Sequence, residues 1–147
     1  MRFSATVIRA VVLAATLVMS NQAMAEYTRY FEDDEQTSYL DRQSITRTGS
    51  EARMWTIDNY RKPQTDLPGK TFVSVKAHWV FDCAKRMSDV LVAFYHAAPM
   101  AEGQEVHSAA RGSSRQWDTV DAGSVGELAF NVACDVKVPA PAQNPNK

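Results

Sequence analysis

The chain has 147 residues, of which 45% are hydrophobic, and its 16 basic and 17 acidic side chains leave a net charge of −1. This balance gives no electrostatic reason for nucleic acid or an anionic membrane surface to be the main partner. The length suits one domain with its own core better than two.

The first 25 residues have the features of a signal peptide, so we expect the protein to be exported. Arg2 and Arg9 supply positive charge, residues 10–19 are apolar apart from Thr16, and Ala23-Met24-Ala25 has the small-x-small pattern of a cleavage site. The apolar run is about half of the roughly 20 residues needed to span a bilayer, so no transmembrane anchor is predicted.

Residues 26–134 are then expected to form the domain. Residues 135–147 hold three prolines and little apolar bulk, which predicts a disordered tail. Glu26 stands where a lipoprotein would carry its acylated cysteine, so we expect that the protein is not a lipoprotein.

The N-terminal part of the domain is expected to form strands. Aromatic residues around Tyr27 and Phe31 suit a first strand, and the acidic run 32–35 that follows is read as a solvated turn. A calcium site is disfavoured there, because the alternating oxygen ligands and the glycine of a calcium loop are missing. The turn signal at 48–50 predicts a hairpin of strands 44–47 and 52–60, and residues 63–69 are predicted to be a loop.

Residues 72–83 alternate between apolar and polar side chains, which predicts an antiparallel strand with one buried face. The predicted inward residues are Val73, Val75, Ala77, Trp79, Phe81 and Cys83, with His78 on an exposed polar face. Residues 87–96 are apolar on both sides, which suits a central strand covered on both faces.

After a turn at 99–103, residues 104–109 are predicted to be a short polar strand, followed by a loop at 111–115 and a short segment at 117–120. Ser124 and Glu127 fit a capping box, which predicts a helix from there to about Cys134. Its inward side is expected to carry Val125, Leu128, Ala129 and Val132. Residues 130–138 also alternate as a strand would, so both readings stay open.

The two cysteines, Cys83 and Cys134, are expected to form a disulfide, because export leads to an oxidising compartment. The bridge would close a loop of 134 − 83 + 1 = 52 residues, which is worth roughly 4 kcal/mol in the chain-entropy model. A reactive or metal-bound thiol pair is the alternative, but the chain has no Cys-x-x-Cys motif.

No catalytic, cofactor-binding or metal-binding residues are assigned. The histidines His78, His96 and His107 are the natural candidates for an active site, and no recognised catalytic or phosphate-binding motif surrounds them. Basic residues could instead line a patch for an acidic or sulfated ligand, or could simply be solvated. They are Arg61, Lys62, Lys85, Arg86, Arg111 and Arg115.

An ordered series of short fragments resembles the surface-adhesin protein E family of Gram-negative bacteria. The fragments are Ser38-Tyr39-Leu40-Asp41-Arg42-Gln43-Ser44-Ile45, Arg53-Met54-Trp55, Asp58-Asn59-Tyr60, Ser74-Val75-Lys76, Phe81-Asp82-Cys83, Phe94-Tyr95-His96, Trp117-Asp118 and Gly123-Ser124 leading to Cys134.

The resemblance implies an α+β fold, in which one C-terminal helix packs on a small, mostly antiparallel sheet with a Cys83–Cys134 bridge. It further implies a non-catalytic envelope protein without a cofactor, the capacity to form homodimers, and host matrix or serum proteins such as vitronectin and laminin as partners. Because no acylated cysteine follows the leader, a soluble periplasmic protein with a structural or assembly role is the alternative to a cell-surface adhesin.

Overall fold

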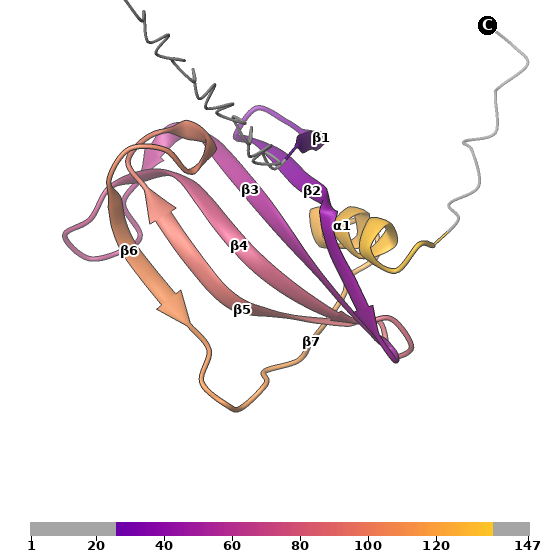
Figure 1. The fold of residues 1–147 in the computed structure, drawn as a ribbon. Coiled ribbons are helices and arrows are strands. Elements are labelled where there is room, and N and C mark those ends of the chain that lie inside the picture. The colour runs from indigo at the N-terminus through magenta and orange to yellow at the C-terminus, as the bar shows by residue number, and fades with distance from the viewer. Residues whose placement is uncertain (1–25, 137–147) are drawn as a thin grey trace, which may run out of the picture.

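The computed structural model describes residues 26–136 as one antiparallel sheet with a single α-helix packed on it (Figure 1). The predicted signal peptide and most of the predicted tail, residues 1–25 and 137–147, lie outside the described residues. The elements are β1 (Tyr27–Glu32), β2 (Gln36–Thr48), β3 (Glu51–Gln64), β4 (Phe72–Asp82), β5 (Met87–His96), the one-turn 3-10 helix η1 (Pro99–Ala101), β6 (Glu105–Ala110), β7 (Asp118–Thr119) and α1 (Val125–Ala133).

The strands lie side by side in chain order from β1 to β6, so each strand pairs with its neighbour in sequence. The short strand β7 pairs with the start of β5, at Met87 and Ser88, where β6 no longer runs alongside it. The expected fold class, an antiparallel sheet with one C-terminal helix, is confirmed.

The predicted hairpin is present, but its strands are longer than expected. Gly49 takes a φ of 60° in the turn, a conformation that glycine adopts without strain. Strand β3 continues through Pro63 to Gln64, so the predicted loop at 63–69 begins two residues too early. Pro63 is tolerated in β3 because it lies beyond Tyr60, where the pairing of β3 with β2 ends. Proline has no backbone N–H, and no hydrogen bond to β2 is lost at this position.

The alternation along β4 predicts one buried face, which we call the helix face: Val75, Ala77 and Phe81 are buried as predicted, whereas Val73 and Trp79 are half-buried. The helix face carries Ala52 and Met54 of β3 opposite Phe81 and Trp79 of β4, and α1 covers this end of it. Leu40 of β2 completes the core beneath the helix.

The other side of the sheet, here called the opposite face, is less exposed than predicted. Val80 is fully buried there, as is Ser74, because two connections fold over the two ends of this face. At one end Ser74 Oγ donates to the Ala98 carbonyl and accepts from Ala101 N, which holds η1 against the sheet. At the other end Asp89 accepts from Gln116 N, which holds the loop before β7.

The prediction for residues 87–96 is confirmed as a strand but not as one covered on both faces. Only Asp89 and Ala93 of β5 are buried, and the remaining side chains of the strand are partly exposed. In the middle of the sheet Ile57 and Ala77 are buried, whereas Trp55 and His78 stay half-buried between the two connections.

Helix α1 begins as predicted: Ser124 Oγ accepts from Glu127 N at 3.1 Å, and the Glu127 carboxylate accepts from Gly123 N at 2.8 Å. Residues 130–133 belong to this helix, so the alternative prediction of a strand over residues 130–138 is wrong for these four residues. The predicted inward side is also partly wrong, because Leu128 is 42% exposed while Phe130 is 1% exposed. Ala129 and Ala133 are the other buried residues of the helix.

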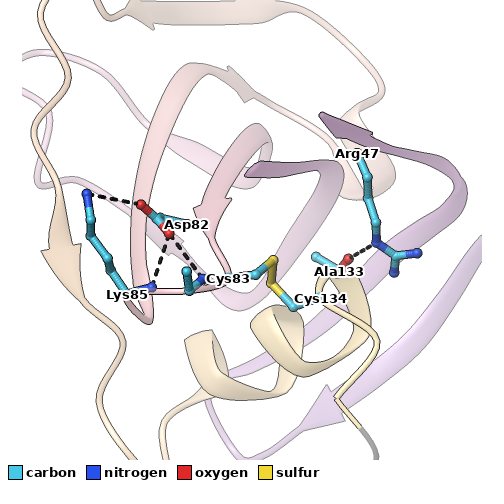
Figure 2. Close-up of a disulfide and its surroundings, with 7 residues drawn as sticks. Arg47, Asp82, Cys83, Lys85, Ala133 and Cys134 are labelled. Carbon is cyan, nitrogen blue, oxygen red and sulfur yellow. Dashed lines mark hydrogen bonds and ion pairs between the residues drawn. A yellow bond between two sulfur atoms is a disulfide. The ribbon is translucent and has the colours of Figure 1, made fainter. Parts of the chain in front are cut away.

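The disulfide between Cys83 and Cys134 confirms the predicted pairing, with 5.6 Å between the Cα atoms (Figure 2). The Asp82 carboxylate accepts hydrogen bonds from Ala84 N and Lys85 N. These bonds stabilise the turn after β4, in which Cys83 lies. On the other side Arg47 Nε of β2 donates to the Ala133 carbonyl at 3.0 Å. The end of the helix is therefore held by a covalent bond to the residue after β4 and by a hydrogen bond from β2.

Replacing both cysteines with serine should lower the free energy of unfolding by roughly 2–5 kcal/mol, because the cross-link no longer restricts the unfolded chain. Urea unfolding of the wild type and of the C83S/C134S variant measures the difference. Wild-type protein unfolded in a reductant is the control and should match the variant. Equal midpoints for the variant and the oxidised wild type would contradict the prediction.

Candidate functional site

The six basic residues singled out in the sequence lie in three places. Arg61 and Lys62 are near the end of β3, next to the turn between β1 and β2, where Arg61 pairs with Glu32 at 2.8 Å. Arg86 is on the helix side, where its guanidinium pairs with Glu127 at 2.6 Å and lies 5.1 Å from the centre of the Phe130 ring. This residue therefore helps to hold α1 on the sheet.

The remaining three, Lys85, Arg111 and Arg115, gather at the end of the sheet opposite to Arg61 and Lys62. We call them the basic rim. Each has a carboxylate near it: Lys85 is 3.6 Å from Asp82, Arg111 is 3.1 Å from Asp89, and Arg115 is 3.7 Å from Glu51.

Because of these ion pairs, the three side chains of the basic rim differ in how accessible their charges are to a binding partner. Asp89 is 3% exposed, so its pair with Arg111 anchors the loop before β7. The Lys85 side chain is 73% exposed and its pair is long, so its charge remains available to solvent. Arg115 lies with its guanidinium 5.5 Å from the centre of the Trp117 ring.

A cluster of aromatic side chains that the sequence analysis did not identify occupies the middle of the opposite face. Trp55 and His78 stack at 4.4 Å between ring centres, and Phe94 lies 6.2 Å from Trp55. The Lys76 ammonium is 5.0 Å from the centre of the Trp55 ring. Burial lowers the pKa of His78, and the positive charge of Arg53 lowers it further.

Residues 52–60 suit a strand, but both alternating sets of side chains mix apolar and polar residues, so the sequence does not indicate which face Trp55 and Ile57 occupy. Pairing with β4 brings Trp55 opposite His78 and makes the stack. Arg53 and Lys76 lie on the same face as this stack, so its aromatic rings have two basic side chains beside them.

The helix face has a groove of about 390 Å³ that α1 leaves open. Asp58 is the acidic residue of its lining. The remaining lining residues are Val75, Ala77, Trp79, Val90, Ala93, Tyr95, Ala109, Ala110 and Arg111. Trp79 is fixed as one wall, because its indole N–H donates to Thr56 Oγ1 at 3.0 Å.

The environment of Asp58 is apolar and aromatic. Burial raises the pKa of Asp58, and a hydrogen bond with Ser38 acts in the opposite direction. Ser38 is fully buried and also accepts from Gln36 Nε2 at 3.1 Å. Burial, with the Asp58 charge as a further cause, also raises the pKa of Tyr30 and raises that of Tyr60 to about 12.

The histidines lie apart from one another. His78 belongs to the aromatic stack, His107 lies beside Tyr95, and His96 pairs with Ser74 and Glu105 in the strand ladders. Within residues 26–136 no hydrogen bond joins a histidine to a carboxylate, and no group of three or more potential metal ligands is found. Over the same residues no helix has the length and apolar character needed to cross a membrane.

The raised pKa of Asp58 has a consequence for stability. The folded protein keeps this proton to a higher pH than the unfolded chain does, so the stability that neutral Asp58 contributes is present at low pH and is lost as the pH rises through the folded pKa. We therefore expect Asp58→Asn to gain stability relative to the wild type between about pH 4 and pH 7, so that its free energy of unfolding rises relative to that of the wild type. Urea unfolding at both pH values measures this.

The exposed Asp118 of β7 offers a matched control, since Asp118→Asn makes the same chemical change outside the groove. A difference between Asp58→Asn and the wild type that stays constant over this pH range would contradict the prediction.

Comparison with known proteins agrees with the fold. A search of curated protein sequences found none that matches this chain. Among solved structures, protein E from non-typeable Haemophilus influenzae is similar with a TM-score of 0.55 and 15% identity, over 78% of this chain and 79% of that one. A second crystal form of Haemophilus influenzae protein E gives a TM-score of 0.56 and 16% identity, over 74% of this chain and 87% of that one.

At these identities the structural likeness establishes the fold. The family is established by sequence, since the family model described as surface-adhesin protein E matches residues 27–135, nearly the whole of the part that the structure describes. The chain belongs to the surface-adhesin protein E family.

Proposed function

We propose that this chain is an exported, non-catalytic envelope protein that binds host matrix or serum proteins such as vitronectin and laminin. The family match over residues 27–135 is the observation that carries the proposal. We also propose that the protein reaches the cell surface and can form homodimers, as expected from the resemblance.

The charge distribution suggests how such a partner would be bound. The basic rim places Lys85 and Arg115 at one end of the opposite face, and Lys76 stands over Trp55 in its middle. Aromatic and basic side chains that are partly exposed together are typical of protein interfaces, because rings supply contact area and cations supply orientation. An acidic or heparin-like segment of the partner would fit this surface. Arg61 and Lys62 form a separate candidate at the far end of β3.

Immobilised vitronectin and laminin should capture the protein purified from the envelope of an expressing bacterium, with micromolar or tighter affinity in surface plasmon resonance. Added salt should weaken capture, because exposed charges are screened over about 8 Å at physiological ionic strength. Capture no stronger than that of an unrelated protein of equal charge would overturn the proposed ligands and leave the family membership in place.

Charge reversal can tell the two basic regions apart. Lys85→Glu should weaken capture roughly tenfold if the basic rim binds, because it puts a like charge against an acidic partner. Lys62→Glu makes the same test for the other end of the sheet. Lys70→Glu is the matched control, since Lys70 is exposed and donates only to the Val106 carbonyl among the described hydrogen bonds. Equal weakening by all three variants would indicate a non-specific charge effect.

A soluble periplasmic protein with a structural or assembly role is the second candidate. It is favoured by the disulfide, because the bridge occupies both cysteines of the chain and leaves neither to carry a lipid. Osmotic shock of intact cells separates the two candidates. Release of the whole pool with the periplasm, together with protection from external protease, supports the periplasmic role, whereas digestion on intact cells supports the surface adhesin.

A further inference from the structure

The groove on the helix face has the make-up of a ligand site, and of the basic residues singled out in the sequence only Arg111 lines it. Its volume of about 390 Å³ falls within the range of small-molecule pockets. Its floor is apolar, since Val75 and Ala77 of β4 line it together with Ala93 of β5, which pairs with Ala77. Trp79 and Tyr95 add aromatic surface to the lining.

The charges around the groove are not balanced from within the protein. No ion pair of residues 26–136 involves Asp58. Arg111, which also lines the groove, directs its guanidinium to Asp89 at 3.1 Å and to Gln116. The groove thus joins a carboxyl group without a cationic partner to an apolar, aromatic surface.

A second, smaller hollow shows that Asp58 stands where the groove meets the helix. This hollow, of about 150 Å³, is also lined by Asp58 and Trp79, together with Val125, Gly126 and Ala129 of α1. The helix contributes no charged side chain to that lining. A cation that reaches Asp58 would therefore meet no competing positive charge from α1.

We propose that this groove binds a small organic cation, with an apolar body on the floor of the groove and a protonated amine against the Asp58 carboxylate. The volume favours a small molecule over a single protein side chain. Trp79 and Tyr95 in the lining add apolar contact area for the body of such a ligand.

The test uses 4-phenylbutylammonium as the probe and 4-phenylbutanol as its neutral counterpart, with Trp fluorescence and NMR shifts of the Trp79 indole as readouts. The amine should bind at least about tenfold more tightly than the alcohol, since a hydrogen bond to a charged group is stronger than one to a neutral group. Asp58→Asn should remove this preference and leave alcohol binding unchanged. Asp118→Asn should keep the preference.

The pH dependence gives a second readout on the wild-type protein, so the proposal does not rest on the variant folding. The amine stays protonated between about pH 5 and 8, so its binding should tighten as Asp58 ionises, while alcohol binding stays flat. Tyr30, Tyr60 and Tyr95 face this region from β1, β3 and β5, and Arg111 follows β6. His107 lies beside Tyr95, and the Asp58→Asn variant separates any effect of this side chain from that of Asp58.

Equal binding of the amine and the alcohol by the wild type would overturn the proposal, as would a preference for the amine that persists in Asp58→Asn. A peptide, acetyl-Gly-Lys-Gly-amide, tests the other occupant. If it displaces the amine with equal or greater affinity, the groove takes a basic side chain of a protein, and the small-molecule assignment is wrong. None of these outcomes depends on capture by vitronectin or laminin.

Discussion

The attachment of α1 to one end of the sheet is the constraint on which the two candidate surfaces depend. A helix of nine residues is too short to be stable alone in water. It is held by the bridge from Cys134 to Cys83, by Arg47 at the Ala133 carbonyl, and by Phe130 between Phe81 and the Arg86 guanidinium. All of these anchors lie at the same end of the helix face, so the groove beside Asp58 stays open.

The period-two arrangement of β3 gives the two faces of the sheet different chemistry. Arg53 and Trp55 point to the opposite face, whereas Met54 and Asp58 point to the helix face. Six consecutive residues therefore contribute to a cationic aromatic cluster on one side and to an acidic apolar groove on the other. A substitution in this strand can alter one surface while leaving the other intact, because neighbouring side chains do not share a face.

Much of the fold could be predicted from the sequence, because the strands have local signals. The alternating pattern that predicts β4 and the glycine that predicts the turn at Gly49 can each be recognised from residues adjacent in the sequence. The inward side of α1 could not be predicted in this way, since Leu128 and Phe130 are both apolar and the helix has apolar residues around much of its surface. The bridge and the anchor at Arg86 select Phe130, and these contacts come from distant parts of the chain.

The candidate site was harder to predict than the fold for a similar reason. The carboxyl of Asp58 looks ordinary in sequence, and its environment is made by Ser38 of β2, Trp79 of β4 and Tyr30 of β1. The stack of His78 on Trp55 likewise requires the register of β3 against β4. Six basic residues were visible in the sequence, but their separation into three places follows from the length of the strands.

The order of the strands also bears on how the protein acquires its structure. Because each strand from β1 to β6 pairs with the one before it, the sheet can grow by adding one hairpin at a time, and contacts between neighbours in sequence form quickly. Cys134 lies beyond every strand, so the residue that completes the bridge is the last part of the domain to leave a translocation channel. The bridge therefore cannot close until every strand of the sheet has left the channel, and the sequence holds no third cysteine that could pair with Cys83 before then.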